Sequence, residues 1–203
     1  TPAPTPAPTP VPTPAPTPCP TTSINMETGH DTDPNEYDKD HSADCGGTSV
    51  IQGLMTVHDD EKEDRIWSLK CRKIESSGDG VPVEVVKSAR RSDPTKLNSR
   101  FHFECPDGEV LQGMSSSHVG WRGLWRIEDR QFRFWCAKIK NAVVTEGHWS
   151  GQSHYDKLWH PHCGMNQAIV GIKSWGFDRH KWDRLFSCKC ASIVPSPPQG
   201  CAL

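Results

Sequence analysis

One eight-residue motif, called the repeated phrase below, occurs three times in the chain: DRIWSLKC at residues 64–71, DRQFRFWC at 129–136 and DRLFSCKC at 183–190. Each phrase starts with an Asp-Arg pair and alternates apolar or aromatic residues with others. Each also places a cysteine six residues after the arginine. A phrase that recurs with one spacing is the signature of an internal repeat. The sequence therefore predicts three copies of one structural unit.

A second segment precedes each phrase and is equally regular. It follows a cysteine, is rich in β-formers and holds a glycine after an apolar residue: SVIQGLMTV, GEVLQGMSSS and QAIVGIKSW. The alternation in the closing phrases predicts strands whose aromatic residues and cysteines face inward. No stretch shows sustained helical periodicity. We expect an all-β domain of three pseudo-equivalent units, at about 45–74, 105–139 and 163–193, arranged as a pseudo-threefold barrel or prism.

The cysteines suggest how the units are braced. The chain has 203 residues and nine cysteines, none of them in a CxxC pair. This favours disulfides in a secreted protein over a metal site. Because the units are alike, each is expected to close its own loop, which stabilises the fold by about 3 to 4 kcal/mol per bond. The expected pairs are Cys45 with Cys71, Cys105 with Cys136, and Cys163 with Cys190.

Three cysteines lie outside this scheme. Cys188 takes the position that Leu69 and Phe134 hold in the other copies, so it points inward and needs its own partner. The nearest candidate is Cys201. Cys19 is then left over, and an odd cysteine is a candidate for intermolecular pairing. The alternative is that Cys19 pairs with Cys188 or Cys201.

The first eighteen residues, TPAPTPAPTPVPTPAPTP, carry proline at every second position. Proline fixes φ and biases the residue before it toward extended geometry, so this tract is predicted to be a polyproline II arm of about 55 Å. The composition is typical of O-glycosylated stalks, which makes this a candidate glycoprotein. An unmodified linker is the alternative. The candidate glycosylation sites are Thr1, Thr5, Thr9, Thr13 and Thr17.

Residues 19–44 separate the arm from the repeats. Residues 24–44 hold seven acidic side chains against Lys39 alone. Acidic oxygens could bind calcium, but the stretch fails the EF-hand pattern: Glu36 stands where the turn glycine belongs and Ser42 where the bidentate glutamate belongs. We therefore interpret residues 19–44 as a solvated acidic linker and residues 45–203 as the folded domain.

The domain resembles the dermatopontin family. The resemblance rests on the three phrases DRIWSLKC, DRQFRFWC and DRLFSCKC and on the CPDGEV opening of the second unit, and it covers residues 45–203. Phe132, Leu185 and Phe186 replace the tryptophan usual after the Asp-Arg pair, tyrosine is scarce, and the Thr-Pro arm is no part of the family domain. The resemblance implies a secreted, non-catalytic extracellular matrix protein that associates with collagen, proteoglycans and cell surfaces. Its invertebrate members include lectin-like, biomineral-associated and cytotoxic forms.

The Asp-Arg pairs are the most conspicuous charged feature. Neighbours on a strand point to opposite faces, so a pair cannot simply bridge to itself. We expect ion pairs across strands or across units, with ligand contact as the alternative. The residues concerned are Asp64, Arg65, Asp129, Arg130, Asp183 and Arg184.

Two further stretches are candidates for glycan binding. A basic loop could bind sulfated glycosaminoglycan by charge, or could simply be solvated; it contains Lys87, Arg90, Arg91, Lys96 and Arg100. A Trp- and His-rich stretch could stack on sugars or cover the core; its aromatic residues are Trp149, Tyr155 and Trp159. Its histidines lack any known metal spacing, so we expect no metal and no cofactor; they are His148, His154, His160 and His162.

These patterns favour a structural role over a catalytic one. Phosphate loops, nucleophile elbows and HExxH motifs are absent from the sequence. A metal-dependent hydrolase around His160 and His162 is the remote alternative. No apolar run approaches the roughly 18 to 20 residues needed to span a membrane, and we expect no nucleic-acid partner. The predicted function is a secreted matrix or cell-adhesion protein that self-assembles into oligomers or fibres, or bridges collagen, proteoglycan or polysaccharide. The alternative is a carbohydrate-binding module, either a lectin or a glycosaminoglycan binder.

Overall fold

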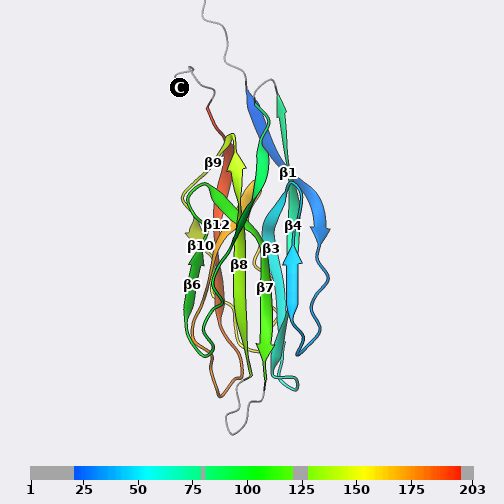
Figure 1. The fold of residues 1–203 in the computed structure, drawn as a ribbon, viewed down its shortest axis with the longest axis vertical. Helices are drawn as coiled ribbons and strands as arrows, with labels where there is room; N and C mark the ends of the chain where they lie inside the picture. Colours follow the sequence, from blue (N-terminus) through cyan, green and yellow to red (C-terminus); the bar gives the residue numbers. More distant parts are fainter. Residues whose placement is uncertain (1–20, 79–80, 121–127, 198–203) are drawn as a thin grey trace, which may run out of the picture.

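The computed structural model describes residues 21–78, 81–120 and 128–197, and within them every regular element is a β-strand. The strands run mainly along the long axis of an elongated domain (Figure 1). This confirms the predicted all-β class. The strands are β1 (Thr22–Asp31), β2 (His41–Asp44), β3 (Ser49–Asp59), β4 (Asp64–Gly78), β5 (Glu84–Arg91), β6 (Phe101–Glu104), β7 (Glu109–Val119), β8 (Asp129–Lys140), β9 (Ala142–Val144), β10 (His148–Trp149), β11 (Gln167–Ser174) and β12 (Phe186–Pro195).

Three antiparallel hairpins form the centre of the domain, one in each predicted unit. They are β3–β4, β7–β8 and β11–β12. Each hairpin shifts its register at the residue before the repeated glycine, so one β-bulge occurs three times at Gly53, Gly113 and Gly171. The first strands of the three hairpins also contact one another pairwise. The structure therefore shows the pseudo-threefold arrangement that the repeat predicts.

The units are joined by strands that cross from one to the next. β2, which precedes the first hairpin, pairs with β7 of the second unit, and β6 pairs in the same way with β11 of the third. The circle closes through residues 159–162, which form isolated bridges to Thr56 and Gly53 of β3. A side chain at Gly53 would lie 2.9 Å from the Pro161 oxygen, so glycine is needed for this close approach. No unit is complete without the segment that its neighbour contributes.

The expected acidic linker at residues 19–44 is wrong for the part that the structure describes. Residues 22–31 form β1, which pairs along β4, and residues 41–44 form β2. The acidic count hid these strands because the charges lie at the surface while Ile24 and Ala43 are buried. β5 holds the place of β1 in the second unit, and β9 and β10 share it in the third. The arm at 1–18 and Cys19 lie outside the described residues.

A hydroxyl side chain also repeats in each connecting segment, just before the strand that crosses over. The Oγ1 of Thr32 accepts a hydrogen bond from the Leu69 backbone at 2.9 Å. Ser92 accepts from Phe134 at 2.9 Å, and Ser150 accepts from Cys188 at 3.1 Å. Each repeat thus begins at the outer strand, well before its first cysteine.

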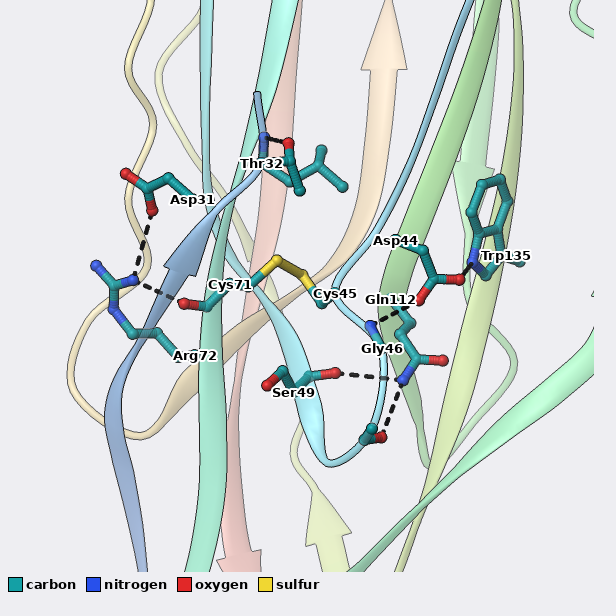
Figure 2. Close-up of a disulfide and its surroundings, with 12 residues drawn as sticks. Asp31, Thr32, Asp44, Cys45, Gly46, Ser49, Cys71, Arg72, Gln112 and Trp135 are labelled. Atoms are coloured by element: carbon teal, nitrogen blue, oxygen red, sulfur yellow. Dashed lines mark hydrogen bonds and ion pairs between the residues drawn. A yellow bond between two sulfur atoms is a disulfide. The ribbon is translucent and has the colours of Figure 1, made fainter. Parts of the chain in front are cut away.

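The three predicted disulfides are formed, and each ties a crossing segment to the second strand of the same unit's hairpin: Cys45–Cys71, Cys105–Cys136 and Cys163–Cys190. Figure 2 shows the first of them. Beside it, Asp44 accepts hydrogen bonds from the Gly46 backbone at 2.6 Å and from Trp135 Nε1 at 2.8 Å. Trp135 belongs to the second unit, so this disulfide is packed at a junction between units.

The predicted bond between Cys188 and Cys201 is wrong, because Cys188 carries a free thiol in the structure. Cys188 is fully buried in the main core beside Ile172 and Phe186. It fills the position of Leu69 and Phe134 as a small apolar side chain, so burial and packing explain it without a partner. Burial also raises the pKa of this thiol. Cys201 lies outside the described residues.

Three aromatic rings meet at the centre of the core, one from each unit. Trp67, Phe132 and Phe186 each lie two residues after the repeated arginine. Their ring centroids are 4.9 to 5.9 Å apart, and all three pairs adopt the edge-to-face geometry that aromatic rings favour. All three side chains are at most 1% exposed. The substitution of Trp by Phe in two copies keeps this packing.

The repeated Asp-Arg pairs form a closed ring of ion pairs between units, which is one of the two arrangements, across strands or across units, that the sequence left open. Each arginine donates two hydrogen bonds to the aspartate of a neighbouring unit. The Nε–Oδ1 distances are 2.9 Å from Arg65 to Asp183, 2.7 Å from Arg130 to Asp64 and 2.6 Å from Arg184 to Asp129. All six residues are 3% to 4% exposed. We call these six residues the ion-pair ring.

The surroundings of the ring compensate the cost of burying charge. The second oxygen of each aspartate also accepts a backbone N–H, from Asp38, Asn98 or Asp156. Burial by itself raises the pKa of Asp64, but the hydrogen bonds and positive charge of Arg130 outweigh it, so this pKa lies below its usual value. A buried charge that loses its partner is costly, so each unit depends on its neighbour.

Substitution of Arg130 by alanine is expected to lower the free energy of unfolding by about 3 to 5 kcal/mol, because it leaves the Asp64 carboxylate buried without a cation. Lys140→Ala is the matched control. Lys140 pairs with Glu84 at 3.1 Å, but both side chains are about half exposed, and such a pair contributes about 1 kcal/mol or less. Guanidinium unfolding of both variants checks this, and equal losses would contradict it.

Cys188 is expected to resist alkylation in the native protein. The buried thiol is both inaccessible and protonated, and the reactive species is the thiolate. Iodoacetamide followed by peptide mass spectrometry should therefore label Cys188 only after unfolding in guanidinium without reductant. Labelling at the same rate before and after unfolding would show that the thiol is not in the core.

Candidate functional site

The predicted basic loop does not form one site. Lys87 and Arg91 lie in β5, over the ring of Trp135, with Lys87 Nζ 6.0 Å and Arg91 Cζ 4.4 Å from the ring centroid. Lys87 also forms an ion pair with Asp44. Lys96 is exposed in the segment that follows β5. The side chain of Arg90 lies outside the described part.

Arg100, the last residue of that loop, is exposed at the start of β6 and belongs to a different surface. It lines a cavity of about 330 Å³ together with Phe101, His102, Lys173, Ser174 and Trp175. That volume is at the lower end of the range for ligand pockets. The basic segment is thus divided between two faces of the domain.

The three aromatic residues of the Trp- and His-rich stretch also separate. Trp159 stacks on Phe186 at 6.1 Å and exchanges two backbone hydrogen bonds with Thr56, so it covers the core. Tyr155 lies near Asp178, and burial together with that carboxylate raises the pKa of its hydroxyl. Trp149 lies on the outer face of the sheet at β10.

Trp149 is the centre of a basic and aromatic cluster. The ammonium of Lys173 in β11 lies 4.1 Å from the Trp149 ring centroid and 5.4 Å from the ring of Trp175. The His102 ring of β6 lies 5.1 Å from Trp149 on another side. Indole faces pack on the apolar face of a sugar, and cations bind sulfate or carboxylate groups. We call Arg100, His102, Trp149, Lys173 and Trp175 the Trp149 face.

A second layer of charge lies beside the Trp149 face. Glu104 accepts hydrogen bonds from Lys189 at 2.6 Å and from His102 at 2.7 Å. The bond from Lys189 is the main cause that lowers the pKa of Glu104. Because Glu104 is held by these partners, Arg100 and Lys173 remain the cations directed at the cavity.

Lys173 and Trp175 were not among the predicted site residues, although the repeat contains a signal for them. In the sheet register, Lys173 corresponds to Met55 and Ser115 of the other hairpins, and Trp175 follows at the position of Val57 and Ser117. Residues that differ at one position of a repeat are free of a common structural duty. The segment QAIVGIKSW was interpreted only as a short β-rich strand of the repeat.

The histidines of the Trp- and His-rich stretch do not assemble into a ligand cluster. Within the described residues, three potential metal-ligating atoms come together in two groups, and neither contains His148, His154, His160 or His162. One group is Asp38, Asp64 and His118, and the other is His58, Asp60 and Asp156. The part of the chain that the structure describes contains no helix capable of spanning a bilayer.

Comparison with known proteins identifies the repeated domain. The family model described as Dermatopontin matches the chain twice, over residues 15–122 and 95–202. The two matches together extend beyond the 45–203 domain that the sequence patterns predict, and they include β1 and β2. No solved structure matches the chain.

Three curated proteins are similar to the chain. Millepora cytotoxin-1 of Millepora dichotoma is 25% identical over 69% of this chain, which spans 58% of that protein's length. The hemagglutinin/amebocyte aggregation factor of Limulus polyphemus is 26% identical over 74% of this chain and 81% of its own. Dermatopontin of Biomphalaria glabrata is 28% identical over 64% of this chain and 80% of its own.

Proposed function

The chain belongs to the dermatopontin family, and on that premise we propose that it is a secreted, non-catalytic protein of the extracellular matrix that binds anionic polysaccharide through the Trp149 face. The observation that carries this proposal is the position of Lys173, whose ammonium lies against both Trp149 and Trp175. A sulfated or carboxylated sugar chain matches this arrangement, because its rings offer apolar faces to the indoles and its anions pair with the cations.

The geometry also supports an extended ligand. The Trp149 face spans β10, β11 and β6 of one sheet, so it is a surface rather than a closed pocket. Gly171 lies between Lys189 and Glu104 in the sheet, and because it has no side chain, nothing projects from the surface at this position. A polymer can lie across such a surface, and its repeated charges can contact several of the cations.

The similarity to a hemagglutinin and aggregation factor supports a bridging role. Bridging requires at least two binding faces on one particle, which a single Trp149 face does not provide. We therefore propose that copies of the chain associate, through the Thr-Pro arm and through Cys19. The proline periodicity predicts that the arm is a stiff spacer, and Cys19 beside it offers a covalent link between copies, with pairing to Cys201 as the alternative.

Heparin binding tests the Trp149 face. Lys173→Ala is expected to weaken binding about fivefold at low ionic strength, the effect of losing one charge contact of about 1 kcal/mol. The matched control is Lys138→Ala, which removes an exposed lysine from β8. Affinity should fall for the wild type as salt is raised. Equal affinities of the two variants, or no binding at low salt, would refute the proposed site.

The role of Cys19 is tested by the size of the native protein. Without reductant, size-exclusion chromatography with light scattering should show species larger than a monomer, and reduction should dissociate them. Cys19→Ser should produce the dissociated form without reductant, while the three disulfides within the domain remain intact. A wild-type protein that is a monomer under all native conditions would remove self-association from the proposal.

A further inference from the structure

The three junctions between units are equivalent in backbone but differ in chemistry. Thr56, Ser116 and Ser174 hold equivalent positions in the three hairpins, and the residue two positions after each of them lies beside a loop. The three loops carry Asp156, Asp38 and Asn98, respectively. These pairs are His58 with Asp156, His118 with Asp38, and Gly176 with Asn98. Among the described residues, the first two junctions each bring a histidine and two carboxylates together.

The junction at His58 holds an imidazole oriented by the fold. The side chain of His58 is 1% exposed, and its Nε2 lies 3.0 Å from the Trp182 carbonyl oxygen. A carbonyl can only accept, so Nε2 carries the proton and donates it. In the neutral ring, Nδ1 then presents a lone pair, which is the arrangement found in metal-binding histidines.

That lone pair points at two carboxylates. Nδ1 lies 3.4 Å from Asp60 Oδ1 and 3.4 Å from Asp156 Oδ1. Neither Nδ1 nor Asp156 Oδ1 has a hydrogen-bond partner, although both atoms are buried. Two carboxylate oxygens and one ring nitrogen thus converge on one point.

The surroundings leave this group open to a cation. Lys181 lies 3.7 Å from the other oxygen of Asp156, so Oδ1 remains directed at His58. The Asp60 side chain is 71% exposed and provides a path from solvent. The three ligand atoms lie within 4.8 Å of one another.

The equivalent junction at His118 differs in the feature that matters. Both ring nitrogens of His118 face carboxylates, at 3.5 Å from Asp38 and 3.4 Å from Glu128. The nearby Asp64 is committed to Arg130 through both oxygens. That histidine therefore has a carboxylate beside each ring nitrogen, and the third acidic side chain of its group, Asp64, belongs to the ion-pair ring.

We propose that His58, Asp60 and Asp156 bind one divalent transition-metal cation, with Zn²⁺ as the best fit. One imidazole and two carboxylates form a ligand set suited to Zn²⁺ and its neighbours, and the remaining positions are open to water. Ca²⁺ fits less well because it takes oxygen ligands. The metal ties the β3–β4 turn of the first unit to the loop of the third, which joins the two ends of the repeat.

Isothermal titration with ZnCl₂ in a non-chelating buffer tests the site. Asp60→Asn and Asp156→Asn are expected to weaken the tightest Zn²⁺ site by about tenfold or more. Glu61→Gln is the matched control, because it removes a carboxylate from the same turn but outside the ligand group, and it should bind as the wild type does. Ca²⁺ should bind the wild type more weakly than Zn²⁺. Circular dichroism of each variant confirms that it is folded.

Two further measurements distinguish a metal from a proton at this position. Zn²⁺ should shift the His58 Nδ1 resonance of the full chain by NMR, and it should raise the melting temperature of the wild type but not of Asp60→Asn. If His58 instead carries protons on both nitrogens and Zn²⁺ leaves its resonances unchanged, the junction is an imidazolium held by two carboxylates and the proposal is overturned. Unchanged Zn²⁺ affinity in the Asp60→Asn variant would overturn it as well.

Discussion

The buried ring of three arginines and three aspartates is the constraint on which the rest of the domain depends. Every arginine is neutralised by a residue of another unit, so no unit can bury its own Asp-Arg pair alone. The crossing strands create the same dependence between units, because each unit contributes a segment that completes the sheet of the next unit. The three copies are therefore a single cooperative structure rather than three beads on a chain.

This constraint separates the positions that must repeat from those that can vary. The ring, the disulfides, the bulge glycines and the hydroxyls at Thr32, Ser92 and Ser150 are the same in every unit because each closes a contact that the symmetry needs. On the outer faces the strands keep the same register in every unit, but the side chains at equivalent positions differ. Asp31, Arg91 and Trp149 hold equivalent places opposite Lys70, Trp135 and Lys189. One face thus carries a simple ion pair, one a cation over the buried indole of Trp135, and one the half-buried indole of Trp149.

Sequence patterns predicted most of the features that recur in every unit, but few of the strands that cross from one unit to the next. The spacing of arginine and cysteine was sufficient for the repeated strands and the disulfides, but it left open whether the ion pairs run across strands or across units. β1 and β2 were missed because their partners are β4 and β7, far along the chain, and because acidic side chains at the surface concealed Ile24 and Ala43. Cys188 was assigned a disulfide partner because the cysteine was considered for its ability to form a disulfide and not as a small apolar side chain of the core. The Trp149 face could not be found in one stretch, since β6, β10 and β11 come together only in the folded sheet.

The place where the circle closes is chemically the least satisfied of the three junctions. Nη1 of Arg130 donates to Lys39 and Ser116, and Nη1 of Arg184 donates to Ser99, but Nη1 of Arg65 has no partner. Thr56 Oγ1, His58 Nδ1 and Asp156 Oδ1 at the same junction are also without hydrogen bonds. This junction joins the first unit to the last, with no short connection between them. Where the first and last repeats of a closed circle meet, the contacts between units are least well matched. A ligand that bonds to the unsatisfied polar groups of this junction therefore gains more binding free energy there than at the other two junctions.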